Sequence, residues 1–252
     1  ASGGSPEERL SRQLLTAAGR GLTELVELLL RRGARASHSR EDGWTGLMAA
    51  SSAGHAAIAD LLLTHRAEVE SPSLDGFTAL MEACTNGHQE VVALLLERRA
   101  STSGASPDGT SPLILSSMYG HLGTVTLLLE HRADATLAKK DFTPLRAACG
   151  NGNAEVARKL LQHTGLDASS PEAAISMVSA CANGHAAVAQ LLLEHGVPAE
   201  ATGEDGTTAL MQACMASRME VAVLLIQMRA DVDAAFDIAK KRNMGAGVRR
   251  VL

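Results

Sequence analysis

A pattern that repeats every 33 residues constrains this 252-residue chain more than any other feature. Segments 42–48, 75–81 and 108–114 each begin with Asp-Gly, continue through Thr or Ser, and end in Leu followed by Met or Ile. Segments 142–145 and 205–211 continue the series. Because a small-residue stretch, a glycine and a Leu-rich run follow each copy, we expect one structural unit to recur and to stack on its neighbours.

Each unit predicts a turn followed by two helices. Asp-Gly is a turn signal, so we expect a short hairpin-like finger, meaning the turn segment between two successive units. Small residues then form a first helix, which the glycine before His88 and its equivalents ends. The Leu-rich run forms a second, antiparallel helix. Stacking buries the apolar faces of both helices, which explains a chain that is 46% hydrophobic and only 2% aromatic.

The unit resembles the ankyrin repeat, and the resemblance covers residues 6–252. It implies an all-α, ankyrin-repeat α-solenoid with six full repeats and a capping helix pair at each end. Residues 1–5 are expected to be a flexible tail, and residues 6–252 a single domain. The N-terminal cap is expected at 6–39, the C-terminal cap at 234–252, and the repeats at 40–72, 73–105, 106–137, 138–169, 170–202 and 203–233. Ser5 and Glu8 have the capping-box spacing, with Pro6 at the first helical position.

Three features depart from the family pattern. Residues 170–177 lack Asp-Gly, so a distorted finger is expected there, and residues 162–165 add one residue at a helix end. Arginine stands where the family usually has a left-handed glycine at a helix end, at Arg66, Arg99, Arg132 and Arg229. With an unchanged backbone each costs about 1 kcal/mol relative to glycine. These arginines either bind acidic groups or are solvated surface charges, and the second interpretation is favoured.

Charge and hydropathy exclude several classes of protein. The net charge is −5 with both signs spread along the chain, so no basic field attracts nucleic acid or an anionic membrane surface. No apolar run approaches the roughly 18 residues of a membrane span, and the first ten residues do not have the pattern of a signal peptide. We therefore expect a soluble monomer in the cytoplasm or the nucleus.

The cysteines and histidines indicate packing rather than chemistry. Cys84, Cys149, Cys181 and Cys214 occupy one position in four units. Stacked units lie about 10 Å apart, beyond the roughly 7 Å Cα limit of a disulfide, so buried thiols in a reducing compartment are predicted. Each unit offers at most one Cys-His pair, whereas zinc needs four ligands. Because nucleophile, phosphate-loop and dinucleotide motifs are also missing, we expect no metal, no cofactor and no enzymatic activity.

Four of the five aromatic residues fall at positions where a partner would bind. Trp44, Phe77 and Phe142 follow the Asp-Gly turn or its equivalent, and Tyr119 ends a first helix. The resemblance implies that fingers and first helices line a concave groove, where aromatic rings make strong contacts with partners. Met118 adds an adaptable contact or fills a gap. The alternative for each ring is packing across the base of its own finger.

The aspartates of the fingers suggest the charge of the partner. Asp42, Asp75 and Asp108 would form an acidic rim that favours a basic or mixed-charge protein or peptide. The alternative is that each aspartate only forms its turn.

The predicted function is that of a non-catalytic scaffold or adaptor, binding a protein or peptide through the groove between Glu41 and Asn151. A standard interface of about 1,600 Å² fits within four units. The alternative is a regulatory or targeting segment of a longer polypeptide that carries an enzyme or a channel elsewhere.

Overall fold

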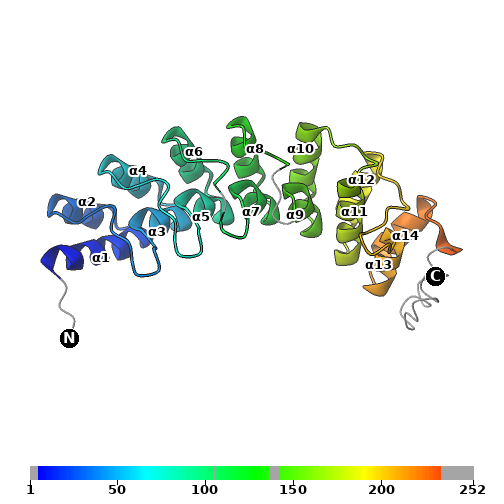
Figure 1. Ribbon diagram of the computed structural model, residues 1–252, viewed down its shortest axis with the longest axis horizontal. Helices are drawn as coiled ribbons and strands as arrows, with labels where there is room; N and C mark the ends of the chain where they lie inside the picture. The colour runs from blue at the N-terminus through cyan, green and yellow to red at the C-terminus, as the bar shows by residue number, and fades with distance from the viewer. Residues whose placement is uncertain (1–4, 105, 137–141, 234–252) are drawn as a thin grey trace. The chain divides into compact units, whose positions relative to one another are not determined.

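Helix pairs make up the described part of the chain. The structure, a computed structural model, describes residues 5–104, 106–136 and 142–233, and within them it has 14 α-helices and no strand beyond isolated bridges (Figure 1). The first helices of the pairs are α1 (Pro6–Gly19), α3 (Gly46–Ala53), α5 (Ala79–Asn86), α7 (Pro112–Met118), α9 (Pro144–Gly150), α11 (Pro171–Asn183) and α13 (Ala209–Met215). The second helices are α2 (Thr23–Arg31), α4 (Ala56–Thr64), α6 (Gln89–Glu97), α8 (Leu122–Glu130), α10 (Ala154–Thr164), α12 (Ala186–Glu194) and α14 (Met219–Gln227). The all-α fold expected from the repeat is confirmed for these residues.

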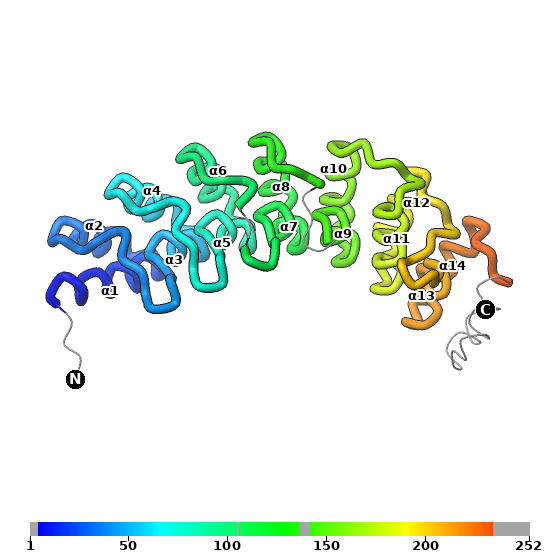
Figure 2. Tube along the Cα trace, viewed as in Figure 1, coloured from blue at the N-terminus to red at the C-terminus, as the bar shows by residue number. Residues whose placement is uncertain are grey.

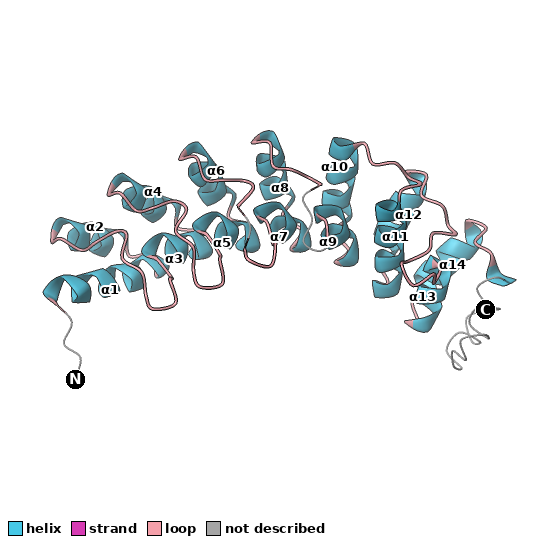
Figure 3. Cartoon of the chain, in the orientation of Figure 1, coloured by secondary structure: helices cyan, strands magenta, loops and turns pink. Residues whose placement is uncertain are grey.

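The pairs belong to two compact units, which divide between residues 141 and 142. Helices α1 to α8 form the first unit and α9 to α14 the second. Inside each unit a first helix packs on the next first helix, as α3 does on α5, and a second helix packs on the next second helix, as α4 does on α6. Figure 2 follows the chain from one pair to the next, and Figure 3 shows the fingers as loops between them.

Some of the expected elements fall outside the described residues. These are residues 1–4 of the expected tail, residues 137–141 around the start of the repeat expected at 138–169, and the C-terminal cap expected at 234–252.

Threonine or serine starts each first helix. The Ser5 hydroxyl accepts a hydrogen bond from the Glu8 amide, and the Glu8 carboxylate accepts one from the Ser5 amide, so the predicted capping box of α1 is confirmed. In the later pairs the hydroxyl of the motif residue accepts a hydrogen bond from the backbone amide three residues on. These N-caps are Thr45, Thr78, Ser111, Thr143, Ser170 and Thr208. The hydroxyl of the motif therefore supplies an acceptor to an otherwise unpaired helical N–H group.

Glycine and histidine join successive pairs of the first unit. Gly54 and Gly87 end α3 and α5 with φ of 78° and 71°, in the left-handed region. A Cβ at Gly87 would lie 2.4 Å from Nδ1 of His121, so the histidine of the next pair packs directly on the glycine. His88 Nε2 lies 3.0 Å from the Ser52 carbonyl oxygen, and His121 Nε2 lies 3.0 Å from that of Thr85. These carbonyls belong to the last turns of α3 and α5, where helices have unpaired acceptors.

The second unit uses the same contact with one substitution. His185 Nε2 lies 3.0 Å from the Gly150 carbonyl oxygen at the end of α9. In the last described pair an arginine replaces the histidine, and Arg218 Nε donates to the Ala182 carbonyl oxygen at 3.3 Å. Four pairs, those that begin with α5, α7, α11 and α13, thus cap the first helix of the pair before them.

The finger expected at residues 170–177 is replaced by helix. Helix α11 begins at Pro171 and runs for 13 residues, with Ser170 as its N-cap. Ser-Pro-Glu is a helix-start signal, and without Asp-Gly the segment has no turn former, so it folds as the first turns of α11. The prediction of a distorted finger is therefore wrong. The added residue at 162–165 lengthens α10, which ends at Gly165 in the left-handed region.

All four cysteines lie in the core of the stack with free thiols. Burial raises the pKa of Cys149 and of Cys181 to about 12, and it also raises the pKa of Cys84 and Cys214. A thiol with a pKa this high carries almost no thiolate near neutral pH, and thiolate is the reactive form. The prediction of buried core thiols is confirmed.

The four arginines at helix ends adopt the left-handed backbone that the sequence predicted. Their φ values are 65° at Arg66, 66° at Arg99, 62° at Arg132 and 66° at Arg229. All four side chains are exposed. In the second unit Gly165 and Gly196 end their helices with φ of 58° and 95°, where the same conformation carries no Cβ cost.

We expect His88→Ala to lower the free energy of unfolding by about 1–3 kcal/mol, because it leaves the Ser52 carbonyl without its hydrogen bond. The control is His65→Ala. His65 is exposed, and its side chain hydrogen-bonds within the described residues only to the Leu61 carbonyl of its own helix, so we expect a change within about 0.5 kcal/mol. Urea unfolding followed by circular dichroism measures both. Equal losses would contradict a special role for the contact between pairs.

We expect Arg99→Gly to raise the free energy of unfolding by up to about 1 kcal/mol, because it removes a Cβ from the left-handed region. The reciprocal change, Gly165→Arg, should lower it by a similar amount, since no atom lies within 4 Å of the added Cβ and only the backbone is strained. Chemical unfolding of both variants checks the prediction. If both variants changed the free energy of unfolding in the same direction, contacts of the guanidinium group, and not backbone strain, would determine the effect.

Candidate binding surface

The aspartates of the fingers are largely engaged in forming the turns. The Asp42 carboxylate accepts a hydrogen bond from the Trp44 amide at 3.1 Å and pairs with Arg40 at 2.8 Å. The Asp108 carboxylate accepts from the Thr110 amide at 3.1 Å and from the Thr110 hydroxyl at 2.8 Å. Such bonds make both aspartates turn formers, whatever charge they also present.

Asp75 differs from the other two aspartates. In its finger the Ser73 hydroxyl takes the equivalent role, accepting from the Phe77 amide at 3.1 Å. Asp75 is exposed, and its carboxylate has neither a hydrogen bond nor an ion pair within the described part of the chain. Of the three predicted acidic residues, it is therefore the one whose charge is fully presented to solvent.

Neighbouring fingers are in direct backbone contact. The Leu74 amide donates to the Asp42 carbonyl oxygen at 2.8 Å, which links the first two fingers. A Cβ at Gly43 would lie 2.9 Å from the Ser73 Cα atom. Gly43 is therefore needed for two reasons: its φ of 79° is strained for other residues, and a side chain there would collide with the next finger.

The predicted rings are presented to different degrees. Trp44 and Phe77, on adjacent fingers, are half-buried, as is Met118 at the end of α7. Tyr119 is 53% exposed and stacks on His121, with ring centroids 6.3 Å apart. The structure thus brings Trp44 and Phe77 onto neighbouring fingers, whereas Tyr119 lies at the far end of a first helix. Phe142 is half-buried and belongs to the second unit.

Two further residues near these fingers were not predicted from the sequence. Leu74 lies in the second finger beside Asp75 and is 76% exposed, more than any other large apolar side chain in the described ranges. The sequence does mark Leu74 as unusual, because it stands directly before Asp-Gly, where the neighbouring fingers have Glu41 and Pro107.

Glu82 is the second missed residue. It lies on α5, half-buried, where the neighbouring first helices have Ala49 and Leu115. Burial raises the pKa of Glu82 above its ordinary value, and a hydrogen bond from Ser52 opposes part of that rise. Asn86 completes the polar cluster, with its side-chain amide 3.3 Å from the Ser52 hydroxyl. The cluster places a partly desolvated carboxyl group on the first helices.

Metal binding and membrane crossing find no support in residues 5–104, 106–136 and 142–233. This part of the chain has no group of three or more His, Cys, Asp or Glu side chains that could hold an ion. Nor does any of its helices have the length and apolarity needed to span a bilayer.

Stacked helix pairs joined by finger turns define a helical repeat protein. The family model for ankyrin repeats matches in three copies, over residues 14–104, 99–172 and 173–235. The chain therefore belongs to the ankyrin-repeat family, whose repeats are generally protein–protein interaction modules. A search of curated proteins finds no matching relative.

We expect Glu82→Gln to stabilise the protein at pH 7. The folded-state pKa of Glu82 is raised, so the ionised carboxylate destabilises the fold above that pKa, whereas below the ordinary value of 4.5 the group is protonated in both states. The gain from glutamine should therefore shrink as the pH falls and vanish below 4.5. Urea midpoints at pH 7 and pH 4 measure it. A gain that persists at pH 4, or one equalled by Glu41→Gln on an exposed finger, would contradict the burial argument.

Proposed function

We propose that this protein is a non-catalytic scaffold that binds a basic or mixed-charge protein or peptide through its first unit. The finger surface, as we call it, consists of Trp44, Leu74, Asp75, Phe77, Glu82, Met118 and Tyr119. One observation carries the proposal: the second finger presents a 76% exposed leucine beside a carboxylate that has neither a hydrogen bond nor an ion pair within the described residues. An exposed apolar side chain next to a free charge is the composition of an interface centre with its polar rim.

Rigidity of the fingers favours binding. In the second finger the Ser73 amide donates to the Phe77 carbonyl oxygen at 2.9 Å and the Gly76 amide to that of Ser73 at 2.8 Å. Together with the bond between Leu74 and Asp42, these contacts fix the finger backbone before a partner arrives. A preorganised surface loses little conformational entropy on binding, so more of the contact energy contributes to affinity.

Charge selects the partner. Asp75 has no ion pair or hydrogen bond to any described residue, and Glu82 is held where a neighbouring cation would favour its ionised form. A lysine or arginine of the partner would gain from both groups, whereas an acidic partner would be repelled. Asp42 and Asp108 contribute mainly by holding the turns, and Phe142 of the second unit is not needed for the proposed surface. The buried thiols suit a reducing compartment, such as the cytoplasm or the nucleus.

Site-specific photo-crosslinking tests the finger surface. A photoreactive phenylalanine analogue at Leu74 or Tyr119 should capture one reproducible partner in the cells that make the protein. The same analogue at Glu130, exposed at the end of α8, is the matched control and should capture none. Trp44→Ala with Phe77→Ala should reduce capture about tenfold or more, because interface rings carry much of the binding energy.

Two readouts make the result decisive. Circular dichroism must show unchanged helix content, because Trp44 and Phe77 are half-buried and their loss affects packing too. Tyr119→Ala, which truncates a mainly exposed ring, should weaken capture at Leu74 with a loss of stability no larger than the roughly 0.5–1.5 kcal/mol of its stacking on His121. Equal capture at Glu130, or capture unaffected by all three ring truncations, would show that the finger surface is not the binding site.

A further inference from the structure

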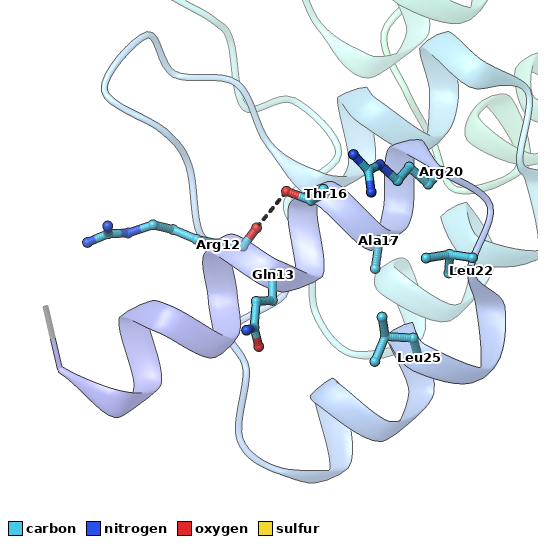
Figure 4. Close-up of a pocket in the computed structure, with 7 residues that line it drawn as sticks. All are labelled: Arg12, Gln13, Thr16, Ala17, Arg20, Leu22 and Leu25. Atoms are coloured by element: carbon cyan, nitrogen blue, oxygen red, sulfur yellow. Dashed lines mark hydrogen bonds between the residues drawn. The ribbon is translucent and has the colours of Figure 1, made fainter. Parts of the chain in front are cut away.

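The outer face of the first helix pair is apolar and open. Three leucines of this pair, Leu22, Leu25 and Leu28, are 45%, 40% and 46% exposed. Leu22 and Leu25 line a groove of about 430 Å³ between α1 and α2 (Figure 4). Figure 4 shows both leucines and Ala17 pointing toward one another between the two helices. None of the finger-surface residues lines this groove.

Leu25 occupies the position through which later pairs pack on the pair before them. The equivalent residues, one repeat apart along the first unit, are Ile58, Val91 and Thr124. Each of these is at most 1% exposed, and their helices pack in series, with α4 on α2 and α6 on α4. Leu25 therefore retains a packing side chain on a face that nothing in the described chain covers.

The α1 side of the groove does not suit another repeat of this kind. Gln13 stands where later pairs of the first unit have small residues, and Arg20 stands where they have the uncharged residues Ala53, Asn86 and Tyr119. The residues equivalent to Gln13 are Gly46, Ala79 and Pro112. Leu22 replaces the histidine that caps the preceding pair, so the hydrogen bond that joins pairs could not form here. These substitutions favour a single partner helix over a helix pair. That helix would pack on the leucines of α2 and turn its polar side toward α1.

The charge of the groove indicates which polar side chains the partner helix has on the side that faces α1. The charged residues that line the groove, Arg12 and Arg20, are both cationic. No ion pair or side-chain hydrogen bond engages Arg20 within the described residues, and Arg12 lies 3.9 Å from the Glu8 carboxylate. With six arginines and four glutamates, residues 5–36 have a net charge of +2, whereas the whole chain has −5.

We propose that the groove between α1 and α2 binds an amphipathic helix of a partner protein. Apolar side chains at positions i, i+4 and i+7 of that helix pack on Leu22, Leu25 and Leu28. Carboxylates along one flank face Arg20 and Arg12, where arginine donates paired hydrogen bonds to a carboxylate. This partner is acidic, opposite in charge to the one proposed for the finger surface, so the two surfaces select different ligands.

A pair of synthetic peptides tests the proposal on the full chain. One is an 18-residue helix with leucine at i, i+4 and i+7 and a glutamate flank, and the other replaces each glutamate by lysine. Fluorescence anisotropy should show binding of the glutamate peptide only. Leu25→Asp should weaken that binding roughly tenfold or more, since it places a charge in an apolar contact. Leu122→Asp, at a leucine of α8 with a matched exposure of 39%, should leave it unchanged.

Charge reversal and solution mass complete the test. Arg20→Glu should weaken the glutamate peptide several-fold and allow the lysine peptide to bind. Absence of binding by the glutamate peptide, insensitivity to Arg20→Glu, or equal weakening by Leu122→Asp would each overturn the proposal. So would a concentration-dependent increase of mass in ultracentrifugation that Leu25→Asp abolishes, because the occupant would then be a second copy of this chain.

Discussion

A hydrogen bond from a side chain of one helix pair to the last turn of the preceding first helix is the contact on which the stack depends. His88, His121 and His185 each reach such a carbonyl at 3.0 Å, and Arg218 does so at 3.3 Å. The partner glycine has to lack a Cβ, because the histidine ring occupies that space. One glycine and one histidine thus end a helix, pack two pairs together and supply a hydrogen bond to a partly buried carbonyl.

The regular parts of the fold could be predicted because they follow from local chemistry repeated at a fixed spacing. Asp-Gly turns, the glycine before histidine and the Ser5 cap all act within a few residues of themselves. The contact from His121 to Thr85 could not be predicted from one unit, since it joins residues 36 apart across a packing interface. The finger expected near Ser170 failed for a local reason: the helix-start signal Ser-Pro-Glu outweighed the position in the repeat.

The candidate surface was predictable only in outline. Trp44 and Phe77 were found because their position after Asp-Gly places them on fingers, and Asp42 because of its turn. Leu74 was missed because its exposure depends on how two fingers contact each other. Glu82 was missed because its burial depends on the spacing between α3 and α5. Sequence position fixes which element a residue belongs to, while the free surface depends on neighbours that are distant in the chain.

The histidine contact is also directional. The last turn of α5 obtains its hydrogen bond from His121, which follows it by 36 residues and lies in the next pair. During synthesis from the N-terminus, α3, α5, α9 and α11 therefore leave the ribosome before the side chain that donates to their last turn, which belongs to the next pair. Maturation of the stack on the ribosome lags the growing chain by about one repeat, and the newest pair is always the least complete.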